Sequence, residues 1–115
     1  MLITLDTSTS VPIFEQLTDE LRAQIVNGAL RPSERLPSAR DLARALELNV
    51  HTVLRAYQAL REEGLIIMRP GRGAQVRALP ENFAEIQELL KRAVLLAQDS
   101  GLQAPALITT IKELY

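Results

Sequence analysis

The sequence has no cysteine and few aromatic residues, with two Tyr, two Phe and no Trp among its 115 residues. Without cysteine it can form neither a disulfide framework nor a thiolate metal site, which is typical of a cytoplasmic protein. Apolar residues nevertheless make up 47% of the chain, so the core must be aliphatic. A chain of this length can bury an ordinary core in one compact domain that carries a short appendage.

Long apolar runs and catalytic groupings are missing as well. No segment approaches the roughly 20 consecutive apolar residues of a membrane span, and the first residues do not resemble a secretion signal. There is one His, and the acidic residues fall on the exposed faces of predicted helices, so no nucleophile and base are brought together. We therefore expect a protein that is not an enzyme, needs no cofactor or metal, and does not contact membranes.

The net charge of −1 conceals an uneven distribution of charge. Residues 31–77 contain nine basic residues, all of them Arg, against five acidic residues, which gives this segment a charge of +4. The segments before and after it are acidic, with charges of −3 and −2. Arg suits bidentate contacts with phosphate and guanine, so the middle segment suggests a nucleic-acid partner. An ordinary solvated surface is the alternative, because +4 is modest.

The spacing of apolar residues predicts a mainly α-helical protein with one small β-hairpin. We expect helices at 11–27, 39–45, 50–63 and 82–98, a last short helix that opens at Pro105, and strands at 65–68 and 73–77. Ser38 and Asp41 predict a reciprocal capping box before the second helix. Asn49 is a good cap for the third helix, and Gly64 is a left-handed stop for it.

About three residues separate the second and third helices, and a turn that short forces them to cross as in a helix-turn-helix. The basic turn of residues 69–72 then joins the two strands. This order predicts a winged helix-turn-helix domain over 1–78, followed by two short dimerisation helices over 79–115. In such a domain the start of the second helix of the motif enters the major groove of DNA.

The residues that we expect to bind double-stranded DNA lie on three elements. They comprise the start of the second helix, the first turns of the third helix and the hairpin turn: Ser38, Arg40, Asn49, His51, Thr52, Arg55, Arg69, Gly71 and Arg72. Asn49 serves equally well as a helix cap alone, and His51 as an exposed histidine without a partner. Tyr57 is assigned to the core, with its hydroxyl on a phosphate as the alternative.

These segments resemble the GntR family of bacterial regulators, and most closely its YtrA-type branch. The resemblance covers about residues 10–77 and is carried by Pro12–Leu17, Leu36–Ala43, Asn49–Tyr57, Glu63–Ile66 and Gly71–Gly73. It implies that Arg40, Thr52 and the wing glycine Gly71 contact DNA. Leu54 stands where many family members have a basic residue, and Ser33 where the family usually has Gly.

Only 38 residues follow Arg77, too few for the large ligand-binding or aminotransferase-like domains of most GntR proteins. Two short amphipathic helices cannot bury a whole apolar stripe by themselves. The YtrA-like resemblance implies that they form a homodimer interface, with Phe83, Ile86, Leu90, Ala93, Leu107 and Ile111 as its residues. Folding of the tail back onto the DNA-binding core is the alternative.

The resulting hypothesis is a sequence-specific transcription regulator that acts as a homodimer on a near-palindromic operator, and the resemblance implies that it is a repressor. A winged-helix protein-interaction module without DNA binding is the competing interpretation. A small-molecule effector is a possible further partner, and the sequence identifies none.

Overall fold

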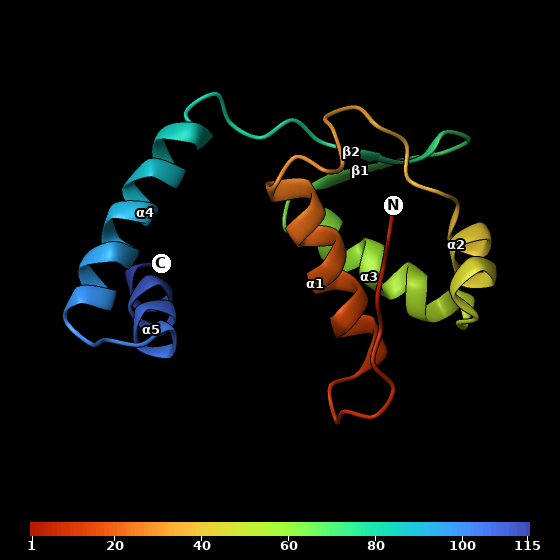
Figure 1. The fold of residues 1–115 in the computed structure, drawn as a ribbon. Coiled ribbons are helices and arrows are strands. Elements are labelled where there is room, and N and C mark those ends of the chain that lie inside the picture. The colour runs from red at the N-terminus through yellow and green to blue at the C-terminus, as the bar shows by residue number, and fades with distance from the viewer. The chain divides into compact units, whose positions relative to one another are not determined.

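The computed structural model describes all 115 residues, which fold as five helices and one antiparallel hairpin (Figure 1). The elements are α1 (Ile13–Val26), α2 (Ala39–Leu46), α3 (Val50–Glu62), β1 (Ile66–Arg69), β2 (Gly73–Val76), α4 (Phe83–Asp99) and α5 (Ala104–Leu114). The chain divides into two compact units, Met1–Leu79 and Pro80–Tyr115. The predicted mainly helical fold with a small hairpin is confirmed.

The core of the first unit is aliphatic, as the composition requires. Helix α3 supplies Val53, Ala56, Tyr57 and Leu60, and α1 packs against it with Leu17, Leu21 and Ile25. Helix α2 and the two strands add further buried residues, which are Leu42, Ala43, Ile66, Ala74 and Val76. The three helices and the hairpin therefore share one continuous core.

Helix α1 begins at Ile13, two residues later than predicted. Pro12 takes an extended conformation (φ −56°, ψ 143°) and acts as the N-cap, and its carbonyl accepts hydrogen bonds from the amides of Glu15 and Gln16. The Gln16 side chain holds the preceding segment in place, because it both accepts from the Asp6 amide and donates to the Asp6 carbonyl, each at 2.8 Å. These bonds hold Asp6, and with it the turn of residues 7–11, against the start of α1.

Only half of the predicted capping box forms at the start of α2. Ser38 Oγ accepts a hydrogen bond from the Asp41 amide (3.1 Å), but the Asp41 carboxylate makes no return bond to the Ser38 amide. Asp is one methylene shorter than the Glu of the usual box, which explains the missing bond. At the other end, Glu47 adopts a left-handed conformation (φ 57°) and starts the turn into α3.

The hairpin differs slightly from the prediction. Arg69 was expected in the turn, but it pairs with Gly73 as the last residue of β1. Only residues 70–72 connect the strands, and Gly71 (φ 75°) and Gly73 (φ 71°) both have left-handed conformations that close such a short loop. Gly64 ends α3 with φ 77°, as predicted.

The second unit consists of α4 and α5 alone. Gly101 (φ 76°) ends α4, and the Leu102 amide donates to the Ala97 carbonyl at 2.8 Å as the chain reverses. Pro105 stands in the first turn of α5, where its missing N–H costs no hydrogen bond. Ala97 is the one buried residue of these two helices.

Candidate DNA-binding surface

The start of α3 presents three polar side chains to solvent. Asn49 Oδ1 accepts a hydrogen bond from the His51 amide (2.8 Å), so Asn49 does cap the helix, while its amide group remains free to donate. His51 is exposed and Thr52 is half-buried on the same turn. This turn therefore offers both donors and acceptors at the end of the helix that a helix-turn-helix inserts into DNA.

Arg40 lies in the first turn of α2, beside the capped end of the helix. Its side chain is exposed and forms no hydrogen bond or ion pair in the structure. The Ser38 hydroxyl, which caps the helix as an acceptor, still has its proton to donate. An Arg beside free helix amides makes this turn suited to hold a phosphate.

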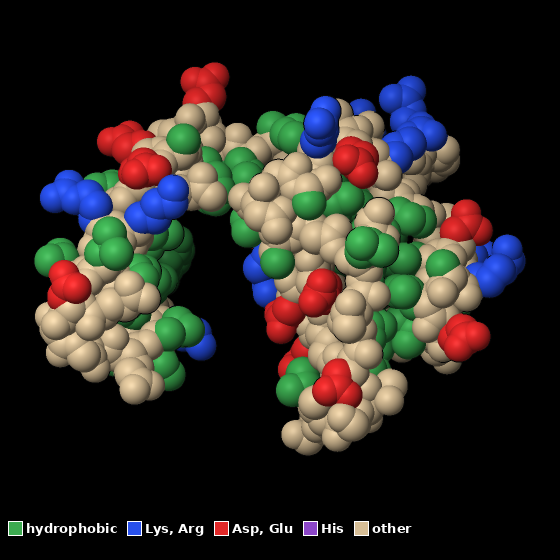
Figure 2. All heavy atoms as spheres, in the orientation of Figure 1, with side chains coloured by type: hydrophobic (Ala, Val, Ile, Leu, Met, Phe, Trp, Pro, Cys, Tyr) green, Lys and Arg blue, Asp and Glu red, His purple; other side chains and the backbone are tan.

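The wing carries two further unpaired arginines. Arg69 and Arg72 are exposed at the closed end of the hairpin, and neither forms an ion pair. Gly71 lies between them, and a Cβ added there would meet no atom within 4 Å, so it is the left-handed backbone that favours glycine. Figure 2 shows basic side chains gathered at the hairpin end, basic and acidic side chains together around α2, and acidic side chains along α1.

Arg55 has a partner that the sequence did not reveal. Its guanidinium stacks over the Phe14 ring of α1, 3.7 Å from the ring centre. Stacking on an aromatic face leaves the N–H donors at the edge of the guanidinium free for other bonds. Nothing in the local pattern pairs two residues that stand 41 positions apart on different helices.

Tyr57 belongs to the core, which confirms the first of its two interpretations. Its side chain is 2% exposed, and its hydroxyl donates to the Pro37 carbonyl at 2.7 Å. Burial raises the pKa of this hydroxyl. A group that is buried and already bonded is not available to touch a phosphate.

The ion pairs of the first unit lie on another part of the molecule. Arg22 forms a bidentate pair with Glu63 (2.7 and 2.8 Å) and also contacts Asp19 (2.8 Å), which joins α1 to the end of α3. The hydrogen bonds to Glu63 raise the pKa of Arg22 above its ordinary value. Asp19 and Glu63 are thus engaged with Arg22, while the basic residues of α2 and the wing form no ion pair.

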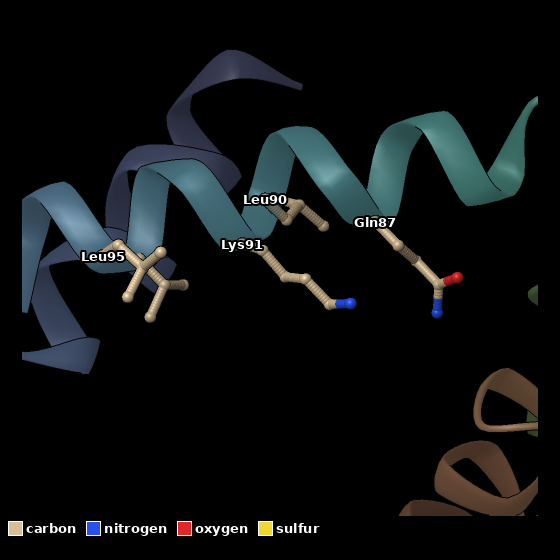
Figure 3. Close-up of a pocket in the computed structure, with 5 residues that line it drawn as sticks. Gln87, Leu90, Lys91 and Leu95 are labelled. Atoms are coloured by element: carbon tan, nitrogen blue, oxygen red, sulfur yellow. The ribbon is translucent and has the colours of Figure 1, made fainter.

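The tail helices expose the apolar residues that were predicted to pair. Ile86 is 39% exposed, Leu90 45% and Ile111 42%, Ala93 is exposed, and Phe83 and Leu107 are half-buried. An apolar groove of about 420 Å³ runs between α4 and α5, lined by Leu90, Ala97 and Ile111 among others. Figure 3 shows a neighbouring hollow on α4, where Gln87, Lys91 and Leu95 project from the helix.

Metal-binding clusters and membrane-spanning helices are two further features to consider. No group of three or more His, Cys, Asp or Glu side chains is placed to hold a metal ion. None of the helices combines the length and apolar character that crossing a membrane demands. The surface formed by Ser38, Arg40, the 49–55 turns and the wing gathers the exposed polar and basic side chains described above, and it is the candidate functional site.

Known proteins resemble this chain in both sequence and fold. Residues 13–76 match the family described as bacterial regulatory proteins, gntR family. The HTH-type transcriptional repressor YtrA of Bacillus subtilis is 32% identical over 119 aligned residues, which cover 98% of this chain and 92% of that protein. These similar proteins are regulators rather than enzymes.

Two solved structures resemble nearly the whole chain. A GntR-family transcription factor, YtrA from Sulfolobus acidocaldarius, has a TM-score of 0.65 and 32% identity, covering 83% of this chain and 99% of its own. A transcriptional antiterminator from Listeria monocytogenes EGD-e has a TM-score of 0.68 and 27% identity, and the match covers 99% of this chain and 90% of that protein. The fold, the basic surface and the family match together show that this chain belongs to the GntR family of bacterial regulatory proteins and is a DNA-binding transcription regulator.

Proposed function

We propose that this protein is a repressor that binds a near-palindromic operator as a homodimer. The first turns of α3 would lie in the major groove, with Asn49, His51 and Thr52 facing base edges. Arg40 and the wing arginines would hold phosphates on either side and fix the orientation of the helix. Repression is the direction suggested by the similarity to a protein that is itself named a transcriptional repressor.

The observation that carries the DNA-binding mode is the set of unpaired arginines on three separate elements. Arg40 on α2, Arg69 on β1 and Arg72 in the hairpin loop are exposed and free of ion pairs. A phosphate is the natural partner for such groups because each contact releases a counterion from DNA. Arg55 joins this set in the proposal, with its guanidinium oriented by the Phe14 ring.

The proposed dimer follows from the exposed face of the tail. Only Ala97 is buried in α4 and α5, although both helices carry several large aliphatic residues. Two helices with one buried residue gain too little from packing to be stable alone. A second copy of the same pair would cover Ile86, Leu90, Ala93 and Ile111 in an isologous interface.

A two-fold dimer also explains how one operator would be read. Each protomer would place its α3 in a major groove, and the two grooves would lie about 34–36 Å apart on one face of the duplex. Operator symmetry would then mirror the symmetry of the protein. The effector remains a prediction, and no ligand is assigned to it.

The DNA-binding mode is tested by changing Arg40 and Arg72 to Ala together. The variant should bind a duplex selected by the wild-type protein at least tenfold less tightly (about 1.4 kcal/mol), and the slope of log affinity against log salt should fall by about 2. Arg61→Ala, an exposed Arg outside the proposed surface, is the matched control and should leave both quantities unchanged. Equal binding by the double variant with an intact fold would favour a protein-interaction module instead.

The dimer is tested separately by sedimentation equilibrium of the wild-type chain. We expect a dimer at micromolar concentration, and the selected DNA sequences should contain inverted half-sites. A monomer in solution together with asymmetric binding sites would overturn the dimer and leave the family assignment untouched.

A further inference from the structure

The segment between α1 and α2 contacts the wing. The Ser33 amide donates to the Val76 carbonyl (2.8 Å), and the Leu36 amide donates to the Ala74 carbonyl (2.9 Å). The Val76 amide donates in return to the Glu34 carbonyl (2.9 Å). Residues 33–36 therefore lie alongside β2, with an isolated antiparallel bridge between Arg35 and Gln75, and this ties the segment to the hairpin that carries Arg69 and Arg72.

The end of the same segment is tied to α3 by one side chain. Tyr57 donates its hydroxyl to the Pro37 carbonyl at 2.7 Å, and no other hydrogen bond reaches this carbonyl. Pro37 immediately precedes Ser38, the N-cap of α2, so its carbonyl lies outside the hydrogen-bond ladder of that helix. The Tyr57 bond is thus the one polar link between α3, the recognition helix of the proposed function, and the start of α2.

The position of this link matters for Arg40. Ser38 holds an extended conformation (φ −59°, ψ 154°) and accepts from the Asp41 amide, so the direction of α2 is set at this residue. Arg40 follows two residues later, before the first full turn is complete. A shift of the Pro37 carbonyl would therefore move Arg40 relative to α3. Loss of the hydroxyl favours such a shift, because an unpaired carbonyl in a partly buried place is costly.

We propose that Tyr57 is a positioning residue for DNA binding: its hydroxyl fixes the start of α2, and with it Arg40, against the recognition helix without touching DNA. The proposal rests on the proposed function in one respect, namely that Arg40 contacts a phosphate. Under this proposal the core residue Tyr57 contributes to the affinity for DNA as well as to the stability of the fold.

The test is a double-mutant cycle between Tyr57→Phe and Arg40→Ala. Affinity for a duplex selected by the wild-type protein is measured at several salt concentrations, at a temperature where circular dichroism shows every variant fully folded. Tyr57→Phe should weaken binding about three- to tenfold and lower the salt slope toward that of Arg40→Ala. In the Arg40→Ala background the same change should alter affinity by less than about twofold.

Ile25→Val is the matched control, because it removes one buried methyl group from the same core without removing a hydrogen bond. Ile25 is 2% exposed and lies near the end of α1, apart from the segment that leads into α2 and from the Phe14–Arg55 contact. This variant should lose stability while its affinity for DNA stays at the wild-type value. A merely structural role for Tyr57 predicts that both variants behave alike.

Either of two results would overturn the positioning role of Tyr57 and leave the proposed DNA-binding function intact. One is wild-type affinity for Tyr57→Phe, and the other is an equal loss of affinity in both backgrounds of the cycle. A wild-type protein that selects no duplex at all would refute the proposed function, and the positioning role with it. That failure is recognised from the wild-type protein alone, before any variant is compared.

Discussion

The two units of the chain contrast in how they use apolar residues. Fourteen of the fifteen buried hydrophobic residues belong to the core of Met1–Leu79, and Ala97 is the only one in Pro80–Tyr115. The tail nevertheless holds Leu and Ile at helical spacing and leaves them exposed, with Leu96 at 68%. The first unit has a continuous buried core, whereas the second unit has many apolar residues that it does not bury.

The units also differ in how their turns are built. The tail reverses at Gly101, a residue that adopts a left-handed conformation at little cost. The first unit also turns at left-handed glycines, but in addition it places Ser33 (φ 69°) and Glu47 (φ 57°) in this conformation, which costs a side-chain-bearing residue about 1–2 kcal/mol. A well-packed core can tolerate such local strain, because the surrounding contacts determine where the chain must turn.

The largest expected effect comes from the core itself. Leu60→Ala removes a side chain with 0% exposure from the centre of α3. We expect the free energy of unfolding to fall by about 2–5 kcal/mol, measured by urea denaturation. Leu95→Ala, a tail leucine that is 60% exposed, is the control and should cost less than about 1 kcal/mol. Equal losses at the two sites would break the contrast between the units.

The next effect concerns pairing of the tails. Leu90→Glu combined with Ile111→Glu places two charges on the exposed apolar face. We expect the dimer dissociation constant to rise by at least about 100-fold, because a charge in such an interface must be desolvated. Affinity for a two-site operator should fall with it, since the second half-site no longer gains from linkage.

Sedimentation of this variant supplies the measurement, and circular dichroism reports whether the first unit keeps its fold. Arg92→Glu changes charge on the polar side of α4 and serves as the control, with dimerisation expected to persist. If the apolar variant stayed dimeric, the pairing surface would have to lie elsewhere on the chain.

The smallest effect tests the strained turn. Glu47→Gly should raise the free energy of unfolding by up to about 1 kcal/mol, because glycine removes the cost of the left-handed conformation. Ala45→Gly, two residues earlier in the exposed part of α2, should lower it by about 0.5–1 kcal/mol. Thermal unfolding of the two variants gives opposite shifts if the turn is strained, and shifts of the same sign if it is not.

Much of the fold could be predicted from local signals. Apolar spacing located every helix and both strands, Asn49 was identified as a cap, and Gly64 as a left-handed stop. The errors were also local: Pro12 starts α1 later than its pattern suggested, Asp41 does not return the capping bond, and Arg69 belongs to β1. Each of these depends on a backbone geometry that residue type only biases.

The contacts that organise the candidate site were harder to predict. Arg55 over Phe14, and the Tyr57 hydroxyl on the Pro37 carbonyl, join residues 41 and 20 positions apart. No period of 2 or 3.6 residues links such pairs, because they meet only when separate helices pack. The sequence indicated which elements face DNA, and it did not indicate how their side chains are held.

The amino-acid sequence by itself determined the order of elements, the aliphatic core and the concentration of Arg in residues 31–77. These depend on composition and short-range spacing, which every stretch of chain carries with it. Only the tertiary structure decided that Arg40, Arg69 and Arg72 stay unpaired while Arg22 is engaged by Glu63, and that the apolar face of the tail is left open. Whether an Arg forms an ion pair, or an apolar side chain stays exposed, depends on which distant segments pack beside it, and that is settled only when the chain folds.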